Sequence, residues 1–589
     1  MQPTDIPPAL LMLASALVMP LLRGWWLRGF ALGLPVLALG WSWMAVSAGA
    51  SMHLSLAGLV LQPVRVHAAT PAFATIFCLM AGLGTLFALR TARRAELVAA
   101  MVYAGGALGV CFSGDLVSLL ICLEIMLLGS AAIVWLGGQP GSRGAGLRYF
   151  IMHTLAGVLI LVGVVLVMQS RIAVGDPSPL KFGALAALLA GHGPVAFAGA
   201  ALVLAGILVC AGAPPFSPWV SDAYPEASST GAVFLSAFTT KSAVFALIVA
   251  FAGLELLVWV GLFMALYGIV FAVLENDIRR VLAYSIVNQV GFMLVGVGIG
   301  TPLSIDGATA HAFAHIIYKA LLMMTAGAVI AATGTRLLSG LGGLYRRMPV
   351  TLWCCIVGAL AISAFPLTSG FTSKGMIDEA VALHAAGLTD AGAASARFVW
   401  AWLALEVASA GVFLHAGIKF PWFVFFNGET QTRAVDPPLH QRAAMVTLAA
   451  LCIVLGVFPQ PLYAMLPTGA ASEIFWPHAY SLSHVVEMLC LLLFSGAAFF
   501  VLLPVLQRTR TVSLDSDWLW RRFPQLVLRD LMEPFISSWQ PFITRAWRRA
   551  AVMARRVRAP KRMIAPAAVV LGVLILYLMF FFVLPAFSP

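Results

Sequence analysis

The chain has 589 residues, of which 61% are hydrophobic and only 10% are charged. A soluble globular protein of this length does not need so much apolar surface, so the composition excludes that class and indicates an all-α polytopic membrane protein. The apolar runs are continuous rather than alternating, which excludes a transmembrane β-barrel.

About 16 segments are long and apolar enough to cross a bilayer as helices. In chain order they are residues 7–22, 29–48, 71–89, 96–112, 114–137, 147–168, 194–213, 227–252, 254–274, 281–299, 306–333, 350–382, 397–427, 443–461, 482–507 and 563–586.

The loops between these segments alternate in basic charge. Arginines gather in every second loop, namely Arg23, Arg28, Arg90, Arg93, Arg94, Arg143, Arg148, Arg279, Arg280, Arg336, Arg346, Arg347, Arg433 and Arg442. The positive-inside rule places these loops in the cytoplasm and both termini outside. We therefore expect a multi-pass protein of the cell (inner) membrane.

The segment 508–562, between the last two predicted helices, is polar and basic. It holds 13 of the 35 Arg and Lys residues against four acidic residues, which is most of the protein's net charge of +12. Its interleaved tryptophans favour an amphipathic helix at the cytoplasmic face, on anionic lipid or on a neighbouring subunit. Because the segment is held at a membrane surface, we do not expect it to bind nucleic acid.

Two predicted helices contain breaks. The stretch "CAGAPPFSPW" (210–219) places three prolines in or just after the seventh helix, and "SAFPLTSGFTSKGM" (363–376) places Pro366 and Gly370 inside the twelfth. The breaks lie five helices apart, so related units containing them would begin on opposite sides of the membrane. That pattern is typical of inverted repeats, whose discontinuous helices mark the transport site in many carriers. The alternative is an ordinary proline kink in each helix.

Lysine is rare in this chain, yet it occurs at membrane depth. Only six of the 35 basic residues are lysines, and four of them fall within predicted spanning segments: Lys241, Lys319, Lys374 and Lys419. A charged lysine at the bilayer centre costs about 2.5–3.5 kcal/mol on insertion scales. Lysine, unlike arginine, can lose its proton when desolvated, so reversible protonation is the use that fits. Lys419 lies close to the interfacial stretch 420–422, which favours a side chain that snorkels to the interface.

The stretch "AHAFAHIIYKALLMM" (310–324) places His311, His315 and Lys319 four residues apart. Steps of four keep all three on one helix face, over about 12 Å of the axis. A metal site would need a third ligand, and the sequence offers neither an HExxH pattern nor a nearby carboxylate, so we expect no metal here. The row is either a polar patch or part of a path through the membrane.

Glu124 is the acidic counterpart of these lysines, because it lies ten residues into the helix that begins at 114. A carboxyl group at that depth is neutral, paired or hydrated, and a role in function is the favoured interpretation. His153, Glu406 and His415 are weaker candidates, since a single polar side chain inside a helix bundle also serves as a packing contact.

The eight cysteines lie inside or at the edges of apolar segments, and none forms a CxxC or a Cys/His ligand set. We expect them to be buried thiols. The chain is therefore expected to carry no iron–sulfur or zinc centre and no other cofactor of its own.

Six motifs together resemble one superfamily. They are "GDLVSLLICLE" (114–124), "PPFSPWVSDAYPEASS" (214–229), "LSAFTTKSAVFAL" (235–247), "ENDIRRVLAYSIVNQVGFM" (275–293), "AHAFAHIIYKALLMM" (310–324) and "LGGLYRRMP…SGFTSKGMI" (341–377). Over residues 70–430 their order and spacing resemble the antiporter-type membrane subunits shared by respiratory complex I and Mrp-type multisubunit Na⁺/H⁺ antiporters. Residue by residue, the motifs most resemble those of the D subunit of the Mrp type.

The resemblance implies two inverted five-helix repeats with broken helices seven and twelve. The implied organisation is N-terminal helices 1–3 in residues 1–95, a first repeat (helices 4–8) in 96–252, a second repeat (helices 9–13) in 253–430, helices 14–15 in 431–507, the basic segment in 508–562 and a last helix in 563–589.

The resemblance also implies a relay of ionisable residues that carries protons along the membrane plane. Matched by position, the relay consists of the helix-five glutamate Glu124, the helix-eight lysine Lys241, the helix-eleven row His311, His315 and Lys319, and Lys374 after the break in helix twelve. His153, Glu406, His415 and Lys419 are lower-ranked members.

One departure from the family pattern concerns helix seven. The family usually has a lysine five residues before the Pro-Leu/Phe of its helix-seven motif, where it pairs with the helix-five glutamate. Here that position is Cys210, counted back from Pro215, and no lysine lies elsewhere in the segment. A buried thiol does not provide a permanent positive charge, so Glu124 needs another partner, Lys241 by default, or the first half of the relay works differently.

These features favour an ion-translocating subunit of a multisubunit monovalent cation/proton antiporter, a transporter rather than an enzyme. Its expected partners are other membrane subunits, lipid, H⁺ and either Na⁺ or K⁺. One alternative is a proton-pumping subunit of a complex I-like or other redox-driven assembly, with the redox centres on partner chains. Another is a scaffold without transport activity, which the missing helix-seven lysine would favour.

Overall fold

The computed structural model describes residues 5–56, 59–175, 180–183, 185–191, 193–388, 396–428, 434–506, 515, 516 and 518. The chain divides into two units, Met1–Asp515 and Ser516–Pro589, and the first is described below. The predicted helix 563–586 lies outside the described residues, and so does the predicted basic segment 508–562 apart from the three positions just given.

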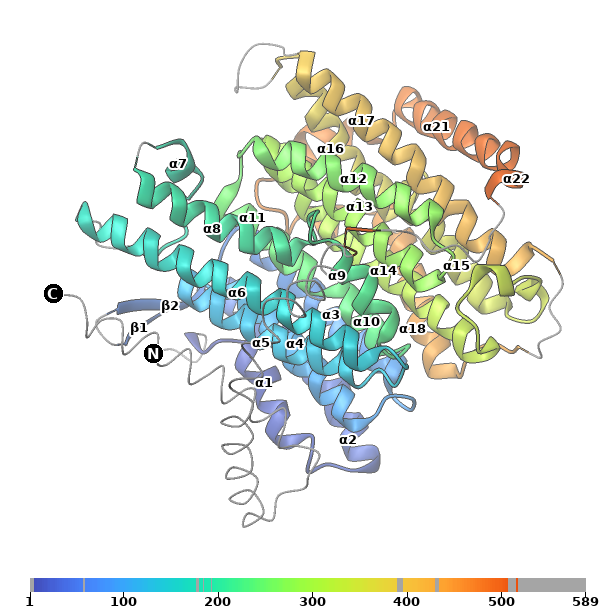
Figure 1. The fold of residues 1–589 in the computed structure, drawn as a ribbon, viewed down its shortest axis with the longest axis horizontal. Coiled ribbons are helices and arrows are strands. Elements are labelled where there is room, and N and C mark those ends of the chain that lie inside the picture. The colour runs from blue at the N-terminus through green and yellow to red at the C-terminus, as the bar shows by residue number, and fades with distance from the viewer. Residues whose placement is uncertain are drawn as a thin grey trace, which may run out of the picture. The chain divides into compact units, whose positions relative to one another are not determined.

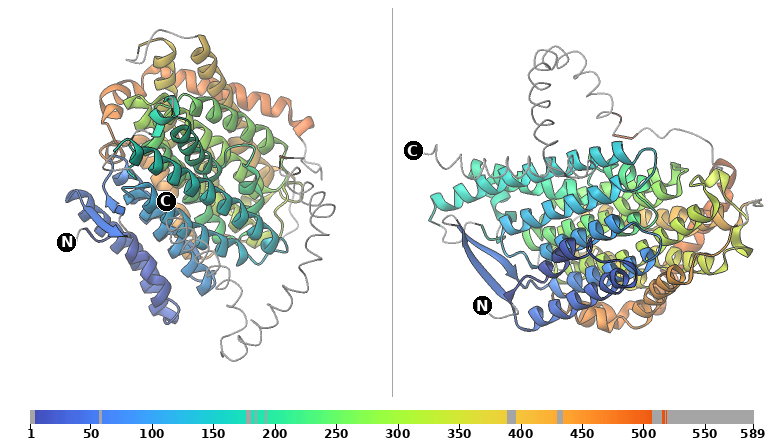
Figure 2. Two further views of the ribbon diagram at one scale, coloured as in Figure 1. Left: turned by 60° about the vertical axis from the view of Figure 1, so that its left-hand side comes forward. Right: turned by 90° about the horizontal axis from the view of Figure 1, so that it is seen from below.

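Helices that lie side by side make up nearly all of the first unit (Figure 1; Figure 2). Its first elements are α1 (Ala9–Val18), α2 (Gly24–Ser47), β1 (Ser51–Leu56), β2 (Leu59–Arg65), α3 (Thr70–Ala88), α4 (Arg94–Phe112), α5 (Leu116–Trp135), α6 (Ser142–Ala173), α7 (Leu185–Ala190), α8 (Pro194–Ala211), α9 (Pro218–Ala223), α10 (Gly231–Ala237) and α11 (Thr239–Phe251).

The later elements are α12 (Leu256–Leu274), α13 (Ile278–Ile299), α14 (Pro302–Thr333), α15 (Pro349–Ile362), α16 (Ser369–Ala385), α17 (Ala396–Val412), α18 (Leu439–Val457), α19 (Gln460–Tyr463), α20 (Trp476–Ala479), α21 (Leu482–Val501) and α22 (Leu503–Leu506). Short 3-10 turns lie at Tyr224–Glu226, Leu338–Gly340 and Leu344–Arg346, and π-helical turns at Phe413–Lys419, Trp422–Phe426 and Ala471–Phe475.

Within the described residues, 13 helical stretches are long and apolar enough to cross a membrane, and Ala9–Val18 and Pro349–Ile362 are shorter apolar helices. Every segment predicted up to residue 507 coincides with one of these stretches. The chain is therefore a multi-pass, all-α membrane protein. The predicted total of sixteen spans depends on 563–586 and stays a prediction.

A β-hairpin that the sequence did not predict lies between α2 and α3. Its strands β1 and β2 pair antiparallel with an irregularity between Met52 and Leu54. The backbone N–H of Gln62 in β2 donates to the carboxylate of Asp115, just before α5, at 2.6 Å. The hairpin is thereby tied to the end of the bundle where α5 begins.

Both predicted helix breaks are confirmed. Helix α8 ends at Ala211, and the chain reaches α9 through Gly212 in the left-handed region and a cis peptide bond between Pro214 and Pro215. Between α15 and α16, Ala364 and Leu367 have φ of 58° and 69°. Such values are strained for residues with a side chain, and they cluster at functional sites.

Gly370 explains how α16 can restart so close to α15. A Cβ at this position would overlap the carbonyl oxygen of Ala361, so only glycine fits there. Two further interruptions were not predicted. Phe238 separates α10 from α11, and the helix that begins with α17 continues as π-helical turns from Phe413 onward.

The two predicted repeats share details beyond their breaks. Their third helices, α6 and α14, are each 32 residues long. Their second helices are each capped by an aspartate, Asp115 for α5 and Asp277 for α13, whose side chain accepts two backbone N–H bonds. Each aspartate also forms an isolated antiparallel bridge with the chain after the third helix, Asp115 with Lys181 and Asp277 with Leu337. The two ranges share these details, and the division at residues 96–252 and 253–430 stays a prediction.

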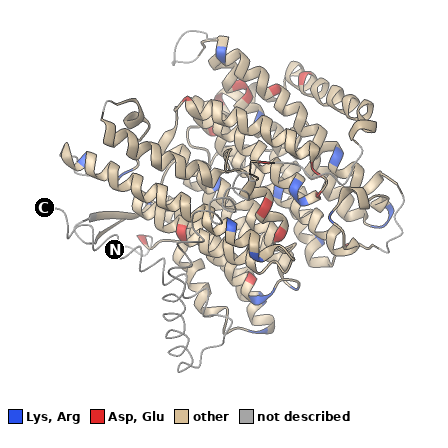
Figure 3. Ribbon diagram, viewed as in Figure 1, with Lys and Arg blue, Asp and Glu red and all other residues tan. Residues whose placement is uncertain are grey.

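Ion pairs join the Arg-rich loops at one end of the bundle. Arg148 pairs with Asp222 at 2.6 Å, and Arg336 pairs with both Glu226 and Asp277 at 3.0 and 2.7 Å. Along the helices themselves charged residues are sparse (Figure 3). The Arg-rich loops linked by these ion pairs thus lie together, as the charge alternation predicted.

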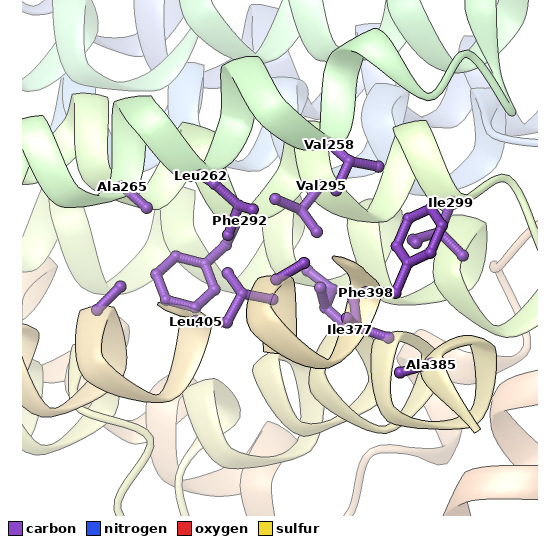
Figure 4. Close-up of a cluster of buried hydrophobic side chains, with 13 residues drawn as sticks. Val258, Leu262, Ala265, Phe292, Val295, Ile299, Ile377, Ala385, Phe398 and Leu405 are labelled. Atoms are coloured by element: carbon purple, nitrogen blue, oxygen red, sulfur yellow. The ribbon is translucent and has the colours of Figure 1, made fainter. Parts of the chain in front are cut away.

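An apolar cluster packs four helices of the second predicted repeat together (Figure 4). Its buried members are Val258, Leu262 and Ala265 of α12, Phe292, Val295 and Ile299 of α13, Ile377, Val381 and Ala385 of α16, and Phe398, Ala401, Leu405 and Ala408 of α17. This packing fixes α16 against its neighbours.

The expectation that all eight cysteines are buried is wrong for Cys490, which is exposed on α21, and Cys122 is only partly buried. The physical reason at Cys490 is that only one face of α21 packs on the bundle. Its opposite face is exposed and apolar, as at Leu493 and Phe494, and a thiol is as acceptable there as in a core.

Candidate functional site

The row predicted on α14 lies in the centre of the bundle. His311, His315 and Lys319 are all fully buried, and α14 packs against α10, α13, α15, α16 and α18. Polar groups at such depth are costly unless they find partners. Their partners come from other helices.

His311 joins three helices through hydrogen bonds. Its Nδ1 lies 3.1 Å from the hydroxyl of Ser373 on α16, and its Nε2 lies 3.0 Å from Oε1 of Gln289 on α13. The hydroxyl of Tyr318 donates to the same Gln289 oxygen at 3.0 Å. Because Ser373 precedes Lys374, His311 connects the α14 row to the broken helix.

Lys319 and Lys241 form the middle of the site. The ammonium of Lys319 donates to the hydroxyl of Ser285 on α13 at 2.8 Å. Lys241, fully buried on α11, donates to the carbonyl of Ser236 at 2.7 Å. Lys241 also interacts electrostatically with His311, His315 and Lys319, so the structure brings the two predicted repeats together at this point.

His315 lies one helical turn before Lys319 on α14. It interacts electrostatically with Lys241, Lys319 and His311, yet neither of its ring nitrogens has a hydrogen-bond partner among the described residues. An imidazole with both nitrogens unsatisfied is ready to exchange a proton with water or with a neighbouring group.

Lys374 lies on α16, directly after the break. Its ammonium donates to the hydroxyl of Ser409 on α17 at 2.6 Å and sits 4.4 Å from the centre of the Phe292 ring. Phe292 belongs to the apolar cluster of Figure 4, so one side of Lys374 contacts apolar side chains.

Two carboxyl groups continue the row beyond Lys374. Asp378 and Glu406 interact with each other, and both interact electrostatically with Lys374. Glu406 was a lower-ranked prediction, and Asp378 was missed. The sequence could have predicted Asp378, because it follows Lys374 by four residues and therefore lies on the same helix face.

His415 and Lys419 complete the set on the π-helical turns after α17. His415 interacts electrostatically with Lys319, Lys374 and Lys419. Lys419 is fully buried and donates to the carbonyls of Ala272, Val273 and Glu275 at 2.6 to 2.8 Å. The expectation that Lys419 snorkels is therefore wrong, because the π-helical turns direct its side chain to the last carbonyls of α12.

Glu124 stands apart from this row. A Cβ added to Gly157 of α6 would overlap Glu124 Oε1, so the carboxyl group rests directly on the backbone of α6. No ion pair among the described residues includes Glu124. The expected default pairing with Lys241 is absent from these ion pairs, since the Lys241 ammonium is bonded to Ser236.

Gly157 gives a direct test of that carboxyl position. Replacing Gly157 by Ala will displace the Glu124 carboxyl by about an ångström and lower transport about tenfold or more, because misplacement on that scale is costly for a reacting group. The measurement is transport in vesicles with normalised amounts of assembled complex. Gly40→Ala in α2 is the control, since a Cβ there meets nothing within 4 Å. Full activity of Gly157→Ala would show that the position of this carboxyl does not matter.

His153 and Cys210 lie near Glu124. Cys210 of α8 interacts electrostatically with Glu124, Tyr149 and Tyr103. His153 of α6 stacks on Tyr149 with ring centres 4.1 Å apart, and its Nδ1 lies 3.1 Å from the Tyr149 carbonyl. The position where the family pattern has a lysine is thus surrounded by aromatic hydroxyl groups.

The whole arrangement is suited to moving protons rather than to binding a substrate. Its members are side chains that gain and lose protons, they lie deep in the bundle, and they occur beside helix breaks that free backbone groups. Because these groups interact electrostatically, a change of charge on one of them changes the potential at its neighbours.

Comparison with known proteins finds similarity to subunits of ion-transporting and respiratory complexes. Residues 113–389 match the family described as NADH:quinone oxidoreductase/Mrp antiporter, TM. Over this range the chain is similar to antiporter-type membrane subunits. The matched range includes Glu124, Lys241, the α14 row and Lys374, whereas Glu406, His415 and Lys419 lie beyond it.

Two curated proteins illustrate the similarity of this chain to membrane subunits. It is 33% identical over 282 residues to NADH-quinone oxidoreductase subunit N of Desulforudis audaxviator, covering 46% of this chain and 55% of that protein. It is 28% identical over 390 residues to the D subunit of a Na⁺/H⁺ antiporter from Alkalihalophilus pseudofirmus, covering 64% of this chain and 75% of that protein. The chain thus spans only about half the length of the first of these relatives.

A solved structure shares the fold of this chain. A chain of the Mrp complex from Dietzia sp. superposes with a TM-score of 0.63 at 21% identity, covering 81% of this chain and 95% of that chain. The all-α fold with broken helices is therefore that of a known class of membrane subunit.

Proposed function

We propose that this chain is the ion-translocating membrane subunit of a multisubunit monovalent cation/proton antiporter. The observation that carries the proposal is the row of buried ionisable groups from Lys241 through the α14 row to Lys374, with the half-buried Glu406 interacting with Lys374. A membrane protein keeps so many costly groups at its centre when they move ions.

Protons pass along this row by coupled titration. Lys241 and Lys319 repel each other when both are charged, so protonation of one favours release from the other. His315 interacts with both lysines and has two unsatisfied ring nitrogens, and His311 contacts Ser373, the residue before Lys374. The carboxyl groups of Asp378 and Glu406 then offer acceptors at the far end.

The test uses everted membrane vesicles that contain the whole complex. Lys241→Ala and Lys374→Ala will each abolish cation-dependent dissipation of a pH gradient while the complex still assembles on native gels. Wild-type transport by both variants would overturn the proposal. Exchanging Na⁺ for K⁺ in the same assay identifies the cation.

A second candidate is a proton-pumping subunit of a redox-driven complex, favoured by the 33% identity to an NADH-quinone oxidoreductase subunit. Such a complex would carry its redox centres on partner chains. Flavin or iron absorbance in the purified complex would favour this candidate, whereas colourless small membrane partners would favour the antiporter.

The proposed placement is in the cell (inner) membrane, with the Arg-rich end in the cytoplasm and both termini outside. Other membrane subunits are its proposed partners, since one relative is an antiporter subunit and one structural neighbour is a chain of the Mrp complex. Labelling of single cysteines introduced into the loops at each end would test the orientation.

A further inference from the structure

Glu124 and Lys241 are separated by a gap that no ion pair among the described residues bridges. Glu124 rests on α6 beside Gly157, and the Lys241 ammonium is bonded to a carbonyl of its own chain segment. A proton that moves between these two groups needs intermediate acceptors. A line of side chains that can accept protons begins on α6.

The line begins on the face of α6 that carries Gly157. His153 lies one turn away from Gly157, and Tyr149 lies one turn further, so the three positions share a face at steps of about 6 Å. His153 Nδ1 faces a backbone carbonyl, which leaves Nε2 as the acceptor. That Nε2 is buried and has no hydrogen-bond partner among the described residues.

The line continues through buried hydroxyl groups from four helices. The Tyr149 hydroxyl donates to Ser130 of α5 at 2.9 Å and lies 3.4 Å from Oγ1 of Thr239 on α11. The hydroxyl of Tyr103 on α4 lies 2.5 Å from the same Thr239 oxygen. All four side chains are buried, and Thr239 belongs to the same helix as Lys241.

This cluster is more than a structural network. A fully apolar contact would be cheaper at this depth than four hydroxyl groups. The Ser130 hydroxyl donates to the Met126 carbonyl at 2.7 Å and so serves as the acceptor for Tyr149. The other three hydroxyl groups can each accept a proton on the oxygen while releasing their own, so a chain of them conducts protons without holding net charge. Cys210 interacts electrostatically with Glu124 and with both tyrosines, which places the cluster around the helix-seven position that lacks a lysine.

We propose that His153 and the hydroxyl cluster Tyr149–Ser130–Thr239–Tyr103 carry protons between Glu124 and Lys241. The inference rests on the proposed function and assigns the residues of its first half. The Glu124 carboxylic acid gives its proton to His153 Nε2 and becomes a carboxylate. His153 releases that proton from the same nitrogen to the hydroxyl cluster. The lone pair of a neutral Lys241 takes the final proton and becomes an ammonium group.

The experiment measures cation-dependent dissipation of a pH gradient by the whole complex in everted vesicles. Tyr149→Phe keeps the ring and removes only the hydroxyl. His153→Gln keeps a polar side chain but removes the group that can take up and release a proton. Each will lower the transport rate about tenfold or more at normal assembly, as expected for loss of a proton-transfer group. Tyr463→Phe is the matched control, since it removes a buried tyrosine hydroxyl that donates to the Thr372 carbonyl outside this cluster.

A rescue variant separates transfer from packing. Cys210→Lys places a protonatable amine within reach of Glu124 and the cluster, and it will restore transport to the Tyr149→Phe protein. A purely structural tyrosine would not be rescued in this way. If Tyr149→Phe fails to assemble, His153→Gln alone decides the question.

The outcomes also separate this inference from the proposed function. Wild-type transport by Tyr149→Phe and His153→Gln, with Lys241→Ala inactive, overturns the route and leaves the antiporter role standing. Wild-type transport by Lys241→Ala and Lys374→Ala overturns the proposed function itself.

Discussion

Replacing Lys319 by Met will abolish cation-dependent dissipation of a pH gradient while the complex still assembles. Lys319 is fully buried, and its one hydrogen bond among the described residues goes to the Ser285 hydroxyl at 2.8 Å. Methionine has a similar unbranched length, so the packing survives. The lost hydrogen bond costs only about 1 kcal/mol. The substitution removes the proton acceptor in the middle of the row. We therefore expect a proton-transport rate that is lower by about 100-fold or more.

The measurement pairs a pH-sensitive fluorescent probe in everted vesicles with native gels of the solubilised complex. Lys181→Met is the matched control, because it removes the same group from an exposed side chain near the start of α5 and will leave transport unchanged. Transport by Lys319→Met at more than half the wild-type rate would mean that the relay does not pass through α14.

The helices and the α14 row could be predicted from sequence because each depends on local information. Long apolar runs have one favourable structure in a bilayer, and prolines close to a glycine disrupt a helix wherever they occur. The spacing of His311, His315 and Lys319 defines one helix face by geometry alone. That this face points inward also follows, since lipid is the less favourable environment for three ionisable groups.

The partners of these groups could not be predicted, because they come from distant parts of the chain. Gln289 lies 22 residues before His311 and Ser373 lies 62 residues after it, and each is an ordinary polar residue in the sequence. Only the packing of α13 and α16 against α14 brings them together. Likewise Tyr149 and Tyr103 gain a role through Thr239, which lies 90 and 136 residues away from them.

Lys419 shows how a local signal can mislead. Its neighbours at 420–422 are typical of a membrane interface, and the sequence therefore favoured a snorkelling side chain. The position of the Lys419 side chain depends on the π-helical turn Phe413–Lys419, which the spacing of apolar residues in the sequence does not predict. That turn directs the ammonium to the end of α12 instead of to the lipid headgroups.

Replacing Lys419 by Met will therefore destabilise the subunit rather than stop the relay alone. The ammonium donates to the carbonyls of Ala272, Val273 and Glu275 at 2.6 to 2.8 Å. Ala272 and Val273 lie in the last turn of α12 and Glu275 directly follows it, so these carbonyls have no partner within the helix and lie at the negative end of its dipole. Methionine leaves them buried and unsatisfied at about 1–3 kcal/mol each. The total is a large share of a typical folding free energy of about 5–15 kcal/mol.

The expected result is a strong loss of assembled complex, seen on native gels after mild heating of the detergent extract. Lys319→Met is the matched comparison, since it removes the same group from an equally buried site with one hydroxyl partner among the described residues and will assemble normally. Normal assembly of Lys419→Met together with a complete loss of transport would instead place Lys419 in the relay. The two lysines thus distinguish the two reasons for which a membrane protein keeps a buried cation: to move protons, or to satisfy the end of a helix that water does not reach.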